Sequence, residues 1–324
     1  MKISDGAFIL ARRLGIGKFL LRTRALGYMR PSDQLQVFLA KKRYLGNVFA
    51  LPPVACGDEV ECHMLLHHAR VREGAWCLYS FAYFSGKRCR FVIHDDGSLA
   101  EEDCSVLSRL FPGIQIISRE KADLKVTTYL KSHGYSESIR FRDTLVFGLK
   151  LYDPFLFLTD DSFVLLDSDV LFYSEPTEVL EALKVAVPKY SVDNGYRYVL
   201  PKETMRSALG RECIHQFNPG VVAAHKRVLD FAKTERWLMR PEFWASDGVK
   251  GHYYGELTLW AMNMSLAGAL PLSEKYAICP PFPGDMKTVS GHYCGGGYWA
   301  SLFYSRGIPY IANRIVATAS YGWC

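Results

Sequence analysis

A chain of 324 residues, 49% of them hydrophobic, can bury one large core or two smaller ones, and this composition excludes intrinsic disorder. Its 39 Lys and Arg residues exceed its 33 Asp and Glu residues, which gives a formal net charge of +6. This mild excess suits an anionic ligand or a membrane surface. Because zinc-finger spacing and a basic region with heptads are both missing, we do not expect nucleic-acid binding.

The nine cysteines include no C-x-x-C pair, and a chain of this size does not need disulfides, so we expect reduced thiols. The first thirty residues have only a short apolar patch before Arg12, which is too short for a signal peptide. No apolar run reaches the roughly 18 residues that span a bilayer. We therefore expect a cytoplasmic protein, and peripheral membrane contact through the basic N-terminal segment stays open.

The chain contains two successive regions that differ in amino-acid composition and in hydrophobic pattern. Residues 1–70 are rich in Arg, Lys, Leu and His, and we expect an N-terminal extension of short helices and a connector there. Residues 71–324 are expected to form one catalytic domain. From Ala75, "AWCLYSFAYF" and "CRFVIHDDG" predict strands, "SLAEEDCSVLSRLF" a helix that Ser98 opens, and "GIQIISRE" a further strand.

The next segments continue this alternation. "SIRFRDTLVFGLKLY" predicts a helix that ends before Pro154, and "PFLFLTDDSFVLLDSDVLF" predicts a strand, a turn and a strand. This order of strands and helices indicates an α/β fold with a mostly parallel central sheet covered by helices on both faces. In such folds, ligands gather at the carboxyl ends of the strands.

Two carboxylates stand one residue apart at the end of the apolar run "FVLL". Because residues i and i+2 of a strand point to the same side, Asp167 and Asp169 can converge on one ligand. Burying two carboxylates without a partner is costly, and a divalent cation such as Mg²⁺ or Mn²⁺ removes that cost. The alternative is a strand end that turns into solvent, where Asp-Ser-Asp is ordinary loop chemistry.

Three segments carry a resemblance to a known family. "FVLLDSDVLF" is similar to the D-x-D strand of nucleotide-sugar-dependent glycosyltransferases with the GT-A fold. "FNPGVVAAHKRVLD" and "SGHYCGGGYW" resemble two later segments of the retaining family that contains glycogenin and the bacterial lipooligosaccharide galactosyltransferases. The resemblance spans about residues 75–299, and the order of the three segments is more specific than any one of them.

The resemblance implies a donor site built around a metal ion. Asp167, Asp169 and His292 would be the metal ligands, and Ser168 would belong to the donor site with them. Either of two residues in "VIHDDGS", Asp95 or Asp96, would hydrogen-bond the nucleoside, with simple capping as the alternative. Arg140 and Arg142 stand on the predicted helix before the strand that carries Asp167, and the resemblance implies that they lie near the donor phosphates. The alternative is that they belong to a solvated helix face.

The chain also departs from the family pattern. The family has a lysine shortly after the histidine, but this chain has glycines and Tyr298 there, in "GGGYW". Stabilisation of the leaving group would then fall to Lys287, Arg306 or the metal alone. Glu256 stands where the family usually has Asp-Gln, and Pro219 follows Asn218 in place of a small residue. The resemblance then implies Asn218 and Glu256 as catalytic residues near the acceptor and the developing oxocarbenium.

These observations predict a metal-dependent glycosyltransferase that moves a sugar from a nucleotide-diphosphate donor, expected to be a UDP-sugar, to a hydroxyl group. The acceptor would be a glycan, a lipid-linked molecule or a protein. If the resemblance holds, the anomeric configuration of the sugar is retained. Two alternatives stay open. One is a haloacid-dehalogenase-like phosphatase, whose D-x-D supplies a nucleophile and an acid. The other is a catalytically silent sugar-nucleotide binder. Candidate platforms for sugar stacking are Trp244, Tyr253, Tyr254, Tyr298 and Trp299.

Overall fold

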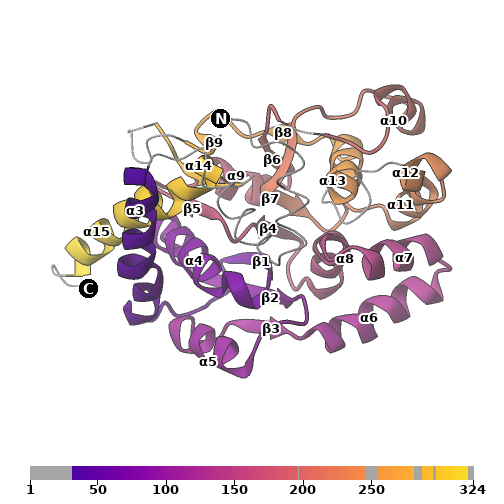
Figure 1. Cartoon of the computed structure of the whole chain (residues 1–324). Coiled ribbons are helices and arrows are strands. Elements are labelled where there is room, and N and C mark those ends of the chain that lie inside the picture. Colours follow the sequence, from indigo (N-terminus) through magenta and orange to yellow (C-terminus); the bar gives the residue numbers. More distant parts are fainter. Residues whose placement is uncertain (1–30, 196, 246–253, 281–286, 295–296, 320–324) are drawn as a thin grey trace, which may run out of the picture.

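The computed structural model describes residues 31–195, 197–245, 254–280, 287–294 and 297–319. A seven-stranded sheet forms its centre, in the order β3-β2-β1-β4-β7-β6-β8 (Figure 1). Its strands are β1 Val60–Leu66, β2 Cys89–Asp95, β3 Gln115–Ile117, β4 Ser162–Leu166, β6 Lys189–Val192, β7 Phe217–His225 and β8 Leu270–Pro271. All paired neighbours are parallel except for β7, which runs antiparallel to β4 and to β6.

A second, three-stranded sheet lies beyond the end of β4. It has the order β5-β10-β9 and consists of β5 Val170–Phe172, β10 Ser290–His292 and β9 Tyr276–Ile278. Strand β10 pairs antiparallel with β5 and parallel with β9. The chain therefore brings a segment near residue 290 beside the residues that directly follow β4.

Helices and short helical turns surround the two sheets. The helices are α3 Pro31–Ala40, α4 Val71–Ser85, α5 Glu101–Leu110, α6 Arg119–Ser132, α7 Ser136–Thr144, α8 Phe147–Phe157, α9 Thr177–Val185, α10 Lys202–Leu209, α11 Phe231–Leu238, α12 Pro241–Ala245, α13 Tyr254–Leu266, α14 Gly297–Leu302 and α15 Ile308–Ala319. The turns are η1 Lys41–Leu45, η2 Gly46–Ala50, η3 His68–Arg70 and η5 Phe303–Gly307. Among the described residues, no helix combines the length and the apolar character that crossing a membrane requires.

The central sheet has an apolar core on each face. On β4, Val164 and Leu166 belong to the core that α4, α5, α9 and α15 share, while Phe163 and Leu165 belong to the core under α6, α7, α8 and α13. Because both faces of β4 are covered, the strand is apolar at successive positions rather than at alternating ones. The expected fold class, an α/β fold with a mostly parallel sheet between two layers of helices, is confirmed.

Several expected elements differ in type. "AWCLYSFAYF" lies in helix α4 and not in a strand, and most of that helix is buried. A helix covered on nearly all sides is apolar at nearly all positions, so its sequence has no helical period. Residues 60–66, where we expected helices and a connector, form β1, which lies between β2 and β4.

The helix expected before Pro154 is two helices, α7 and α8. They meet at a sharp turn where a Cβ atom on Gly148 would lie 2.6 Å from Arg142 Cα, so only glycine fits there. Helix α8 then continues through Pro154 to Phe157, and the strand expected for "PFLFL" is wrong. Proline removes one helical hydrogen bond and often ends or kinks a helix, yet Pro154 is buried inside α8 and the helix continues past it. The fold thus places α8 against the central strands and its residues near the end of β4.

Candidate active site

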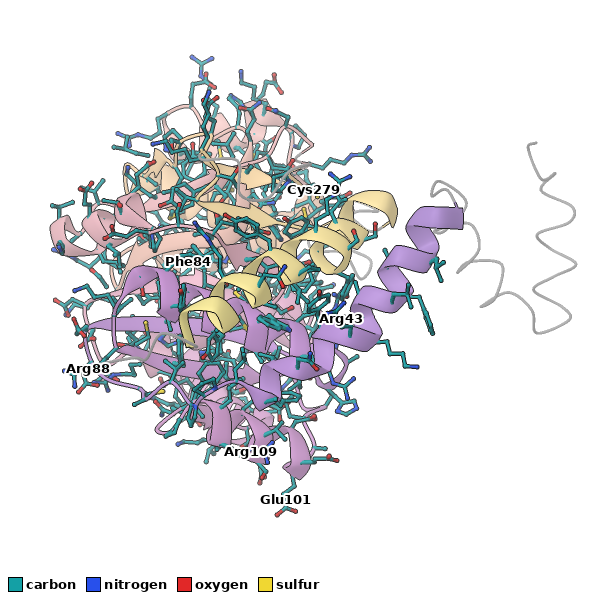
Figure 2. The ribbon with its side chains drawn as sticks, turned by 90° about the vertical axis from the view of Figure 1, so that its left-hand side faces the viewer. Arg43, Phe84, Arg88, Glu101, Arg109 and Cys279 are labelled. Atoms are coloured by element: carbon teal, nitrogen blue, oxygen red, sulfur yellow. The ribbon has the colours of Figure 1, made fainter. Side chains whose placement is uncertain are left out.

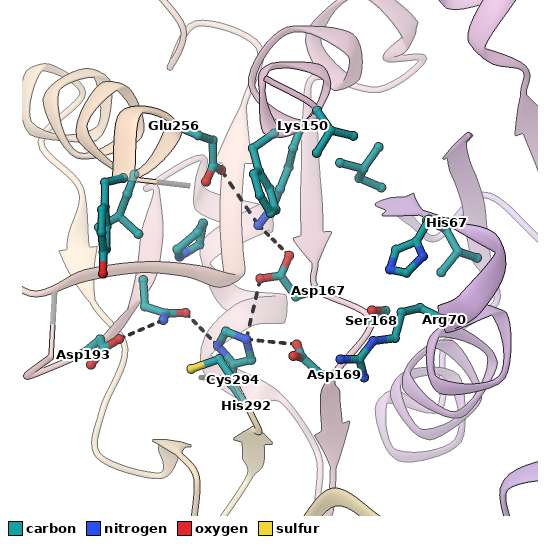
Figure 3. A pocket seen from close by; sticks show the side chains of 18 of the residues that line it. His67, Arg70, Lys150, Asp167, Ser168, Asp169, Asp193, Glu256, His292 and Cys294 are labelled. Atoms are coloured by element: carbon teal, nitrogen blue, oxygen red, sulfur yellow. Dashed lines mark hydrogen bonds and ion pairs between the residues drawn. The ribbon is translucent and has the colours of Figure 1, made fainter. Parts of the chain in front are cut away.

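Three side chains that can bind a metal converge at the carboxyl end of β4. Asp167 follows β4, Asp169 precedes β5, and His292 is the last residue of β10, which pairs with Val170 of β5. The His292 Nε2 atom lies 3.0 Å from Asp169 Oδ1 and 3.6 Å from Asp167 Oδ2 (Figure 3). One ligand atom from each residue lies within 4.8 Å of the other two. The structure therefore brings together the three residues expected as metal ligands.

The charges of this group depend on one another. Burial alone would lower the pKa of His292, but the charge and hydrogen bond of Asp169 and the charge of Asp167 raise it to about 9. Burial likewise opposes ionisation of Asp169, yet the nearby His292 outweighs burial and lowers the pKa of that carboxyl. Without a cation, His292 is therefore the positive partner of two carboxylates.

The other side of the His292 ring is held by strand β7. Its Nδ1 lies 2.8 Å from Asn218 Oδ1, which also accepts a hydrogen bond from the Gly220 backbone N–H at 2.8 Å. An amide oxygen only accepts, so Nδ1 carries the hydrogen and Nε2 presents its lone pair to the carboxylates when the ring is neutral. Carboxylate oxygens are hard metal ligands and an imidazole nitrogen is a borderline one, and this combination suits Mn²⁺ or Mg²⁺. The residues present fit a divalent cation.

A cavity of about 560 Å³ opens over this group. In Figure 3, Glu256 and Asp193 lie on one side of the two aspartates, and His67 and Arg70 lie on the other. Ser168 also lines the cavity, as does Tyr254. This volume lies in the range of cavities that bury a small organic ligand. The cavity therefore has room for a ligand on both sides of the metal-binding group.

A buried cation joins the two sides of the cavity. Lys150, on α8, places its Nζ 2.5 Å from Asp167 Oδ1 and 3.9 Å from Glu256 Oε1. Burial would lower the pKa of Lys150, but Asp167 and Glu256 raise it, so the ammonium stays charged. Burial raises the pKa of Glu256 to about 7, against the opposing charge of Lys150. The Glu256 Oε1 atom is buried and has no hydrogen-bond partner, so it is available to a ligand.

The structure distinguishes Asp95 from Asp96. Asp95 Oδ1 accepts hydrogen bonds from the backbone N–H groups of Gly97, Ser98 and Leu99, and this carboxylate caps its own turn. Asp96 lines the cavity and accepts a hydrogen bond from the Ser98 hydroxyl at 2.6 Å. Ser98 thus belongs to this turn, and helix α5 begins only at Glu101. Of the two aspartates, Asp96 is the one placed to reach a ligand.

The two arginines expected near the donor phosphates do not line the cavity. Arg142 is buried, and its guanidinium donates two hydrogen bonds to Asp153 and one to Asp123. The Arg140 guanidinium lies 3.9 Å from the centre of the Trp244 ring and pairs with Glu137. Both arginines stabilise contacts between helices. The expected placement is corrected, because their charges are already satisfied away from the metal-binding group.

The remaining candidates either lie outside the described residues or do not line the cavity. Tyr253 lies outside the described residues, as do the side chains of Tyr298 and Trp299 and the basic segment that includes Arg12. Among the described candidates, Trp244 donates from its indole N–H to the Leu238 carbonyl at 2.7 Å and does not line the cavity. Lys287 and Arg306 do not line it either.

Sequence reasoning missed several polar residues of the cavity, among them His67, Arg70, Lys150 and Asp193. Lys150 lies in the apolar stretch "FGLKLYDPF", where a lone cation inside a buried segment was a usable signal. Asp193 accepts a hydrogen bond from Asn218 Nδ2 at 3.2 Å, which extends the chain of polar contacts from His292. His67 and Arg70 follow β1, and we expected no strand there.

Comparison with known proteins gives a likeness of structure only. No family model matches the sequence, and no curated protein matches it. Solved structures similar to this chain include three glycosyltransferases. The galactosyltransferase LgtC, in complex with donor and acceptor sugar analogues, is 15% identical, with a TM-score of 0.41 over 73% of this chain and 87% of that chain.

Mouse xyloside xylosyltransferase 1 is 12% identical, with a TM-score of 0.47 over 67% of this chain and 86% of that chain. GlyE of Streptococcus pneumoniae is 13% identical, with a TM-score of 0.45 over 81% of this chain and 64% of that chain. Because these identities and TM-scores are low, the function of this chain has to be argued from its own site.

Proposed function

We propose that this chain is a metal-dependent glycosyltransferase of the GT-A class that transfers a sugar from a nucleotide-diphosphate donor, expected to be a UDP-sugar, to a hydroxyl acceptor. The observation that carries the proposal is the convergence of Asp167, Asp169 and His292 in a cavity that also contains a buried lysine and a glutamate oxygen without a hydrogen-bond partner. Two carboxylates and an imidazole beside a ligand-sized cavity suit a cation that binds a diphosphate.

On the donor side, the chain supplies positive charge and hydrogen-bonding groups. A bound Mn²⁺ or Mg²⁺ would neutralise the charge that develops on the leaving nucleoside diphosphate. Arg70 lines the same cavity and offers a guanidinium, which fits phosphate oxygens. Asp96, at the end of β2, offers a carboxylate to ribose or base hydrogen-bond donors. These residues would bind and orient the donor.

On the acceptor side, Glu256 is the group with spare hydrogen-bonding capacity. When the sugar leaves the diphosphate, the bond between its anomeric carbon and the phosphate oxygen breaks, and a bond to the acceptor oxygen forms. The acceptor hydroxyl must then lose its proton. Glu256 is buried, its Oε1 has no hydrogen-bond partner and its pKa is raised to about 7, so it would accept this proton near neutral pH. The stereochemical outcome, with retention as our expectation, is read from the anomeric proton of the product by NMR.

The proposal also covers the cellular location of the protein and the class of its acceptor. The eight described cysteines have free thiols, which agrees with the reducing cytoplasm that we propose. The acceptor would be a glycan, a lipid-linked or a protein hydroxyl.

Thermal unfolding in the presence of nucleotides tests the proposal. We expect UDP or a UDP-sugar to raise the unfolding midpoint only with Mn²⁺ or Mg²⁺ present, and we expect slow hydrolysis of one UDP-sugar under the same conditions. Asp169→Asn should abolish both effects. Asp161→Asn is the matched control, because Asp161 lies at the opposite end of β4 from Asp167, is 80% exposed and pairs with Lys226.

The same samples separate the alternatives. Hydrolysis of p-nitrophenyl phosphate without nucleotide would favour the haloacid-dehalogenase-like phosphatase. Metal-dependent nucleotide binding without turnover of any nucleotide sugar, with or without acceptor, would favour the silent binder. Absence of any metal-dependent stabilisation by nucleotides would refute the proposed function.

A further inference from the structure

Helix α3 exposes an apolar face at the edge of the molecule. Leu35, Phe38 and Leu39 are 57%, 63% and 52% exposed. Their spacing of three and four residues places them on one side of the helix. On the other side, Val37 and Ala40 pack against the core. Figure 2 shows α3 standing out beside the body of the protein, with Arg43 at its base.

The elements around α3 are almost free of acidic residues. Helix α3 contacts η1 and η5, and α15 contacts the same two turns. In the sequence, α3, η1, η5 and α15 contain a single acidic residue, Asp33. Their basic residues are Lys41, Lys42, Arg43, Arg306 and Arg314. We call Leu35, Phe38 and Leu39, together with Lys41, Lys42 and Arg43, the α3 surface.

The positive charge of the whole chain is concentrated at this end. Residues 1–45 contain ten Lys and Arg residues and two Asp residues, a net charge of +8. That leaves 29 basic and 31 acidic residues for residues 46–324, a net charge of −2. The exposed apolar face therefore belongs to the part of the sequence with the largest excess of positive charge.

We propose that the α3 surface docks on an anionic lipid bilayer. Aliphatic and aromatic side chains beside lysine and arginine combine the two terms that hold a helix at a membrane interface, which are apolar burial and attraction to anionic headgroups. A second copy of the chain fits less well, because two α3 surfaces of like charge would repel each other. Arg70 of the cavity donates a hydrogen bond to the hydroxyl of Tyr304 in η5, so the docked elements contact the wall of the active site.

Co-sedimentation of the full chain with vesicles tests the proposal. Vesicles of phosphatidylcholine with about 30% phosphatidylglycerol should bind the protein, and vesicles of pure phosphatidylcholine should bind it far more weakly. Raising the salt to about 0.5 M NaCl should release much of it, because salt screens the attraction.

Two sets of variants locate the contact. The triple variant Leu35→Ser, Phe38→Ser, Leu39→Ser should lose at least about tenfold in vesicle affinity. Its control is Leu124→Ser on α6, where Leu124 is 75% exposed. Lys42→Gln with Arg43→Gln should weaken binding by about fivefold for each charge. The control for this pair, Lys121→Gln with Lys131→Gln on α6, changes the net charge equally and should bind nearly as the wild type does.

Three results would overturn the proposal. The chain could fail to bind the anionic vesicles at low salt. The triple variant, with an unchanged thermal midpoint, could bind as well as the wild type, which would place the contact elsewhere in the chain. Sedimentation velocity could show a dimer that the triple variant abolishes, which would make the face an interface between copies. None of these results bears on glycosyl transfer, since metal-dependent nucleotide binding is measured without vesicles.

Discussion

The His292 imidazole and the Asn218 side-chain amide are joined by a hydrogen bond of 2.8 Å between Nδ1 and Oδ1. Asn218 is 5% exposed, and its Nδ2 donates in turn to Asp193. This bond fixes which ring nitrogen faces the two aspartates. Asn218, which we expected near the acceptor, therefore orients the ring of a residue that we expect to be a metal ligand.

Asn218→Leu should weaken Mn²⁺ binding by about 10- to 100-fold, because the His292 ring loses the acceptor that orients it. Asn218→Asp keeps an oxygen at this position and should bind Mn²⁺ more tightly than Asn218→Leu. Titration calorimetry or the loss of the free Mn²⁺ signal in electron paramagnetic resonance measures the affinity. Equal affinities for Asn218→Leu and the wild type would show that the ring does not need this bond.

Gly220 allows the His292 ring to lie against strand β7. A Cβ atom at this position would lie 2.2 Å from His292 Nδ1, which is far inside van der Waals contact. Gly220→Ala should therefore displace the ring, lower the metal affinity and cost about 1–3 kcal/mol of folding stability. At Gly46, a Cβ atom would meet nothing within 4 Å, so Gly46→Ala is the control. Metal titration and urea unfolding of both variants check the prediction.

Lys150 and Glu256 should set the acidic limb of the pH profile. If the ionised Glu256 accepts the acceptor proton, kcat/KM should fall as the pH drops below about 7, where this carboxyl protonates. Lys150 lowers the pKa of Glu256, so Lys150→Met should move the limb to higher pH and reduce the rate by about 10²- to 10³-fold. The exposed Lys226→Met should leave the limb in place. A limb unchanged in Glu256→Gln would assign it to another group.

Some residues of this site can be predicted from the sequence, and others cannot. Asp167 and Asp169 were detectable because carboxylates at the end of a doubly buried strand are costly without a partner. His292 is 123 residues beyond Asp169, and only the resemblance to a family connected them. Their proximity depends on the pairing of β10 with β5, a long-range contact between two three-residue strands that no local pattern specifies.

The basic residues show why local patterns failed elsewhere. Arg142 has the residue type and the position along the chain that a phosphate ligand needs, yet Asp153 and Asp123 take up its guanidinium. Lys150, eight residues later, faces the cavity because the chain turns between α7 and α8. Which cation reaches the site thus depends on the turn at Gly148, and that turn was hidden inside what the sequence predicts as one helix.

A second buried chain of polar groups crosses strands β1 and β2. The Glu61 carboxylate lies 3.0 Å from His63 Nε2, and His63 Nδ1 lies 2.8 Å from His94 Nε2. Glu61 also accepts a hydrogen bond from the backbone N–H of Asp160, which precedes the metal strand. All three side chains are at most 1% exposed. Burial lowers the pKa of His63 and lowers that of His94 well below its ordinary value, so both are neutral in the folded chain near pH 7.

Because of these histidines, the folding stability should begin to fall at a higher pH than the pH at which carboxylates become protonated. In the unfolded chain they bind protons as the pH falls below about 6.5, while in the folded chain their lowered pKa values delay protonation to lower pH. Their contribution to stability is therefore present above pH 6.5 and lost below it, by up to about 1.4 kcal/mol per pH unit for each histidine. Urea unfolding at pH 7.5 and pH 5.5 measures the loss.

His94→Asn separates this effect from the rest of the protein's titration. The variant should be less stable at pH 7.5, because His63 loses its partner, but its stability should fall less between pH 7.5 and pH 5.5 than that of the wild type. His133→Asn, which removes an exposed histidine of the α6–α7 turn, should keep the wild-type pH dependence. If His94→Asn and the wild type lose equal free energy over this range, the buried pair is not the source of the acid sensitivity.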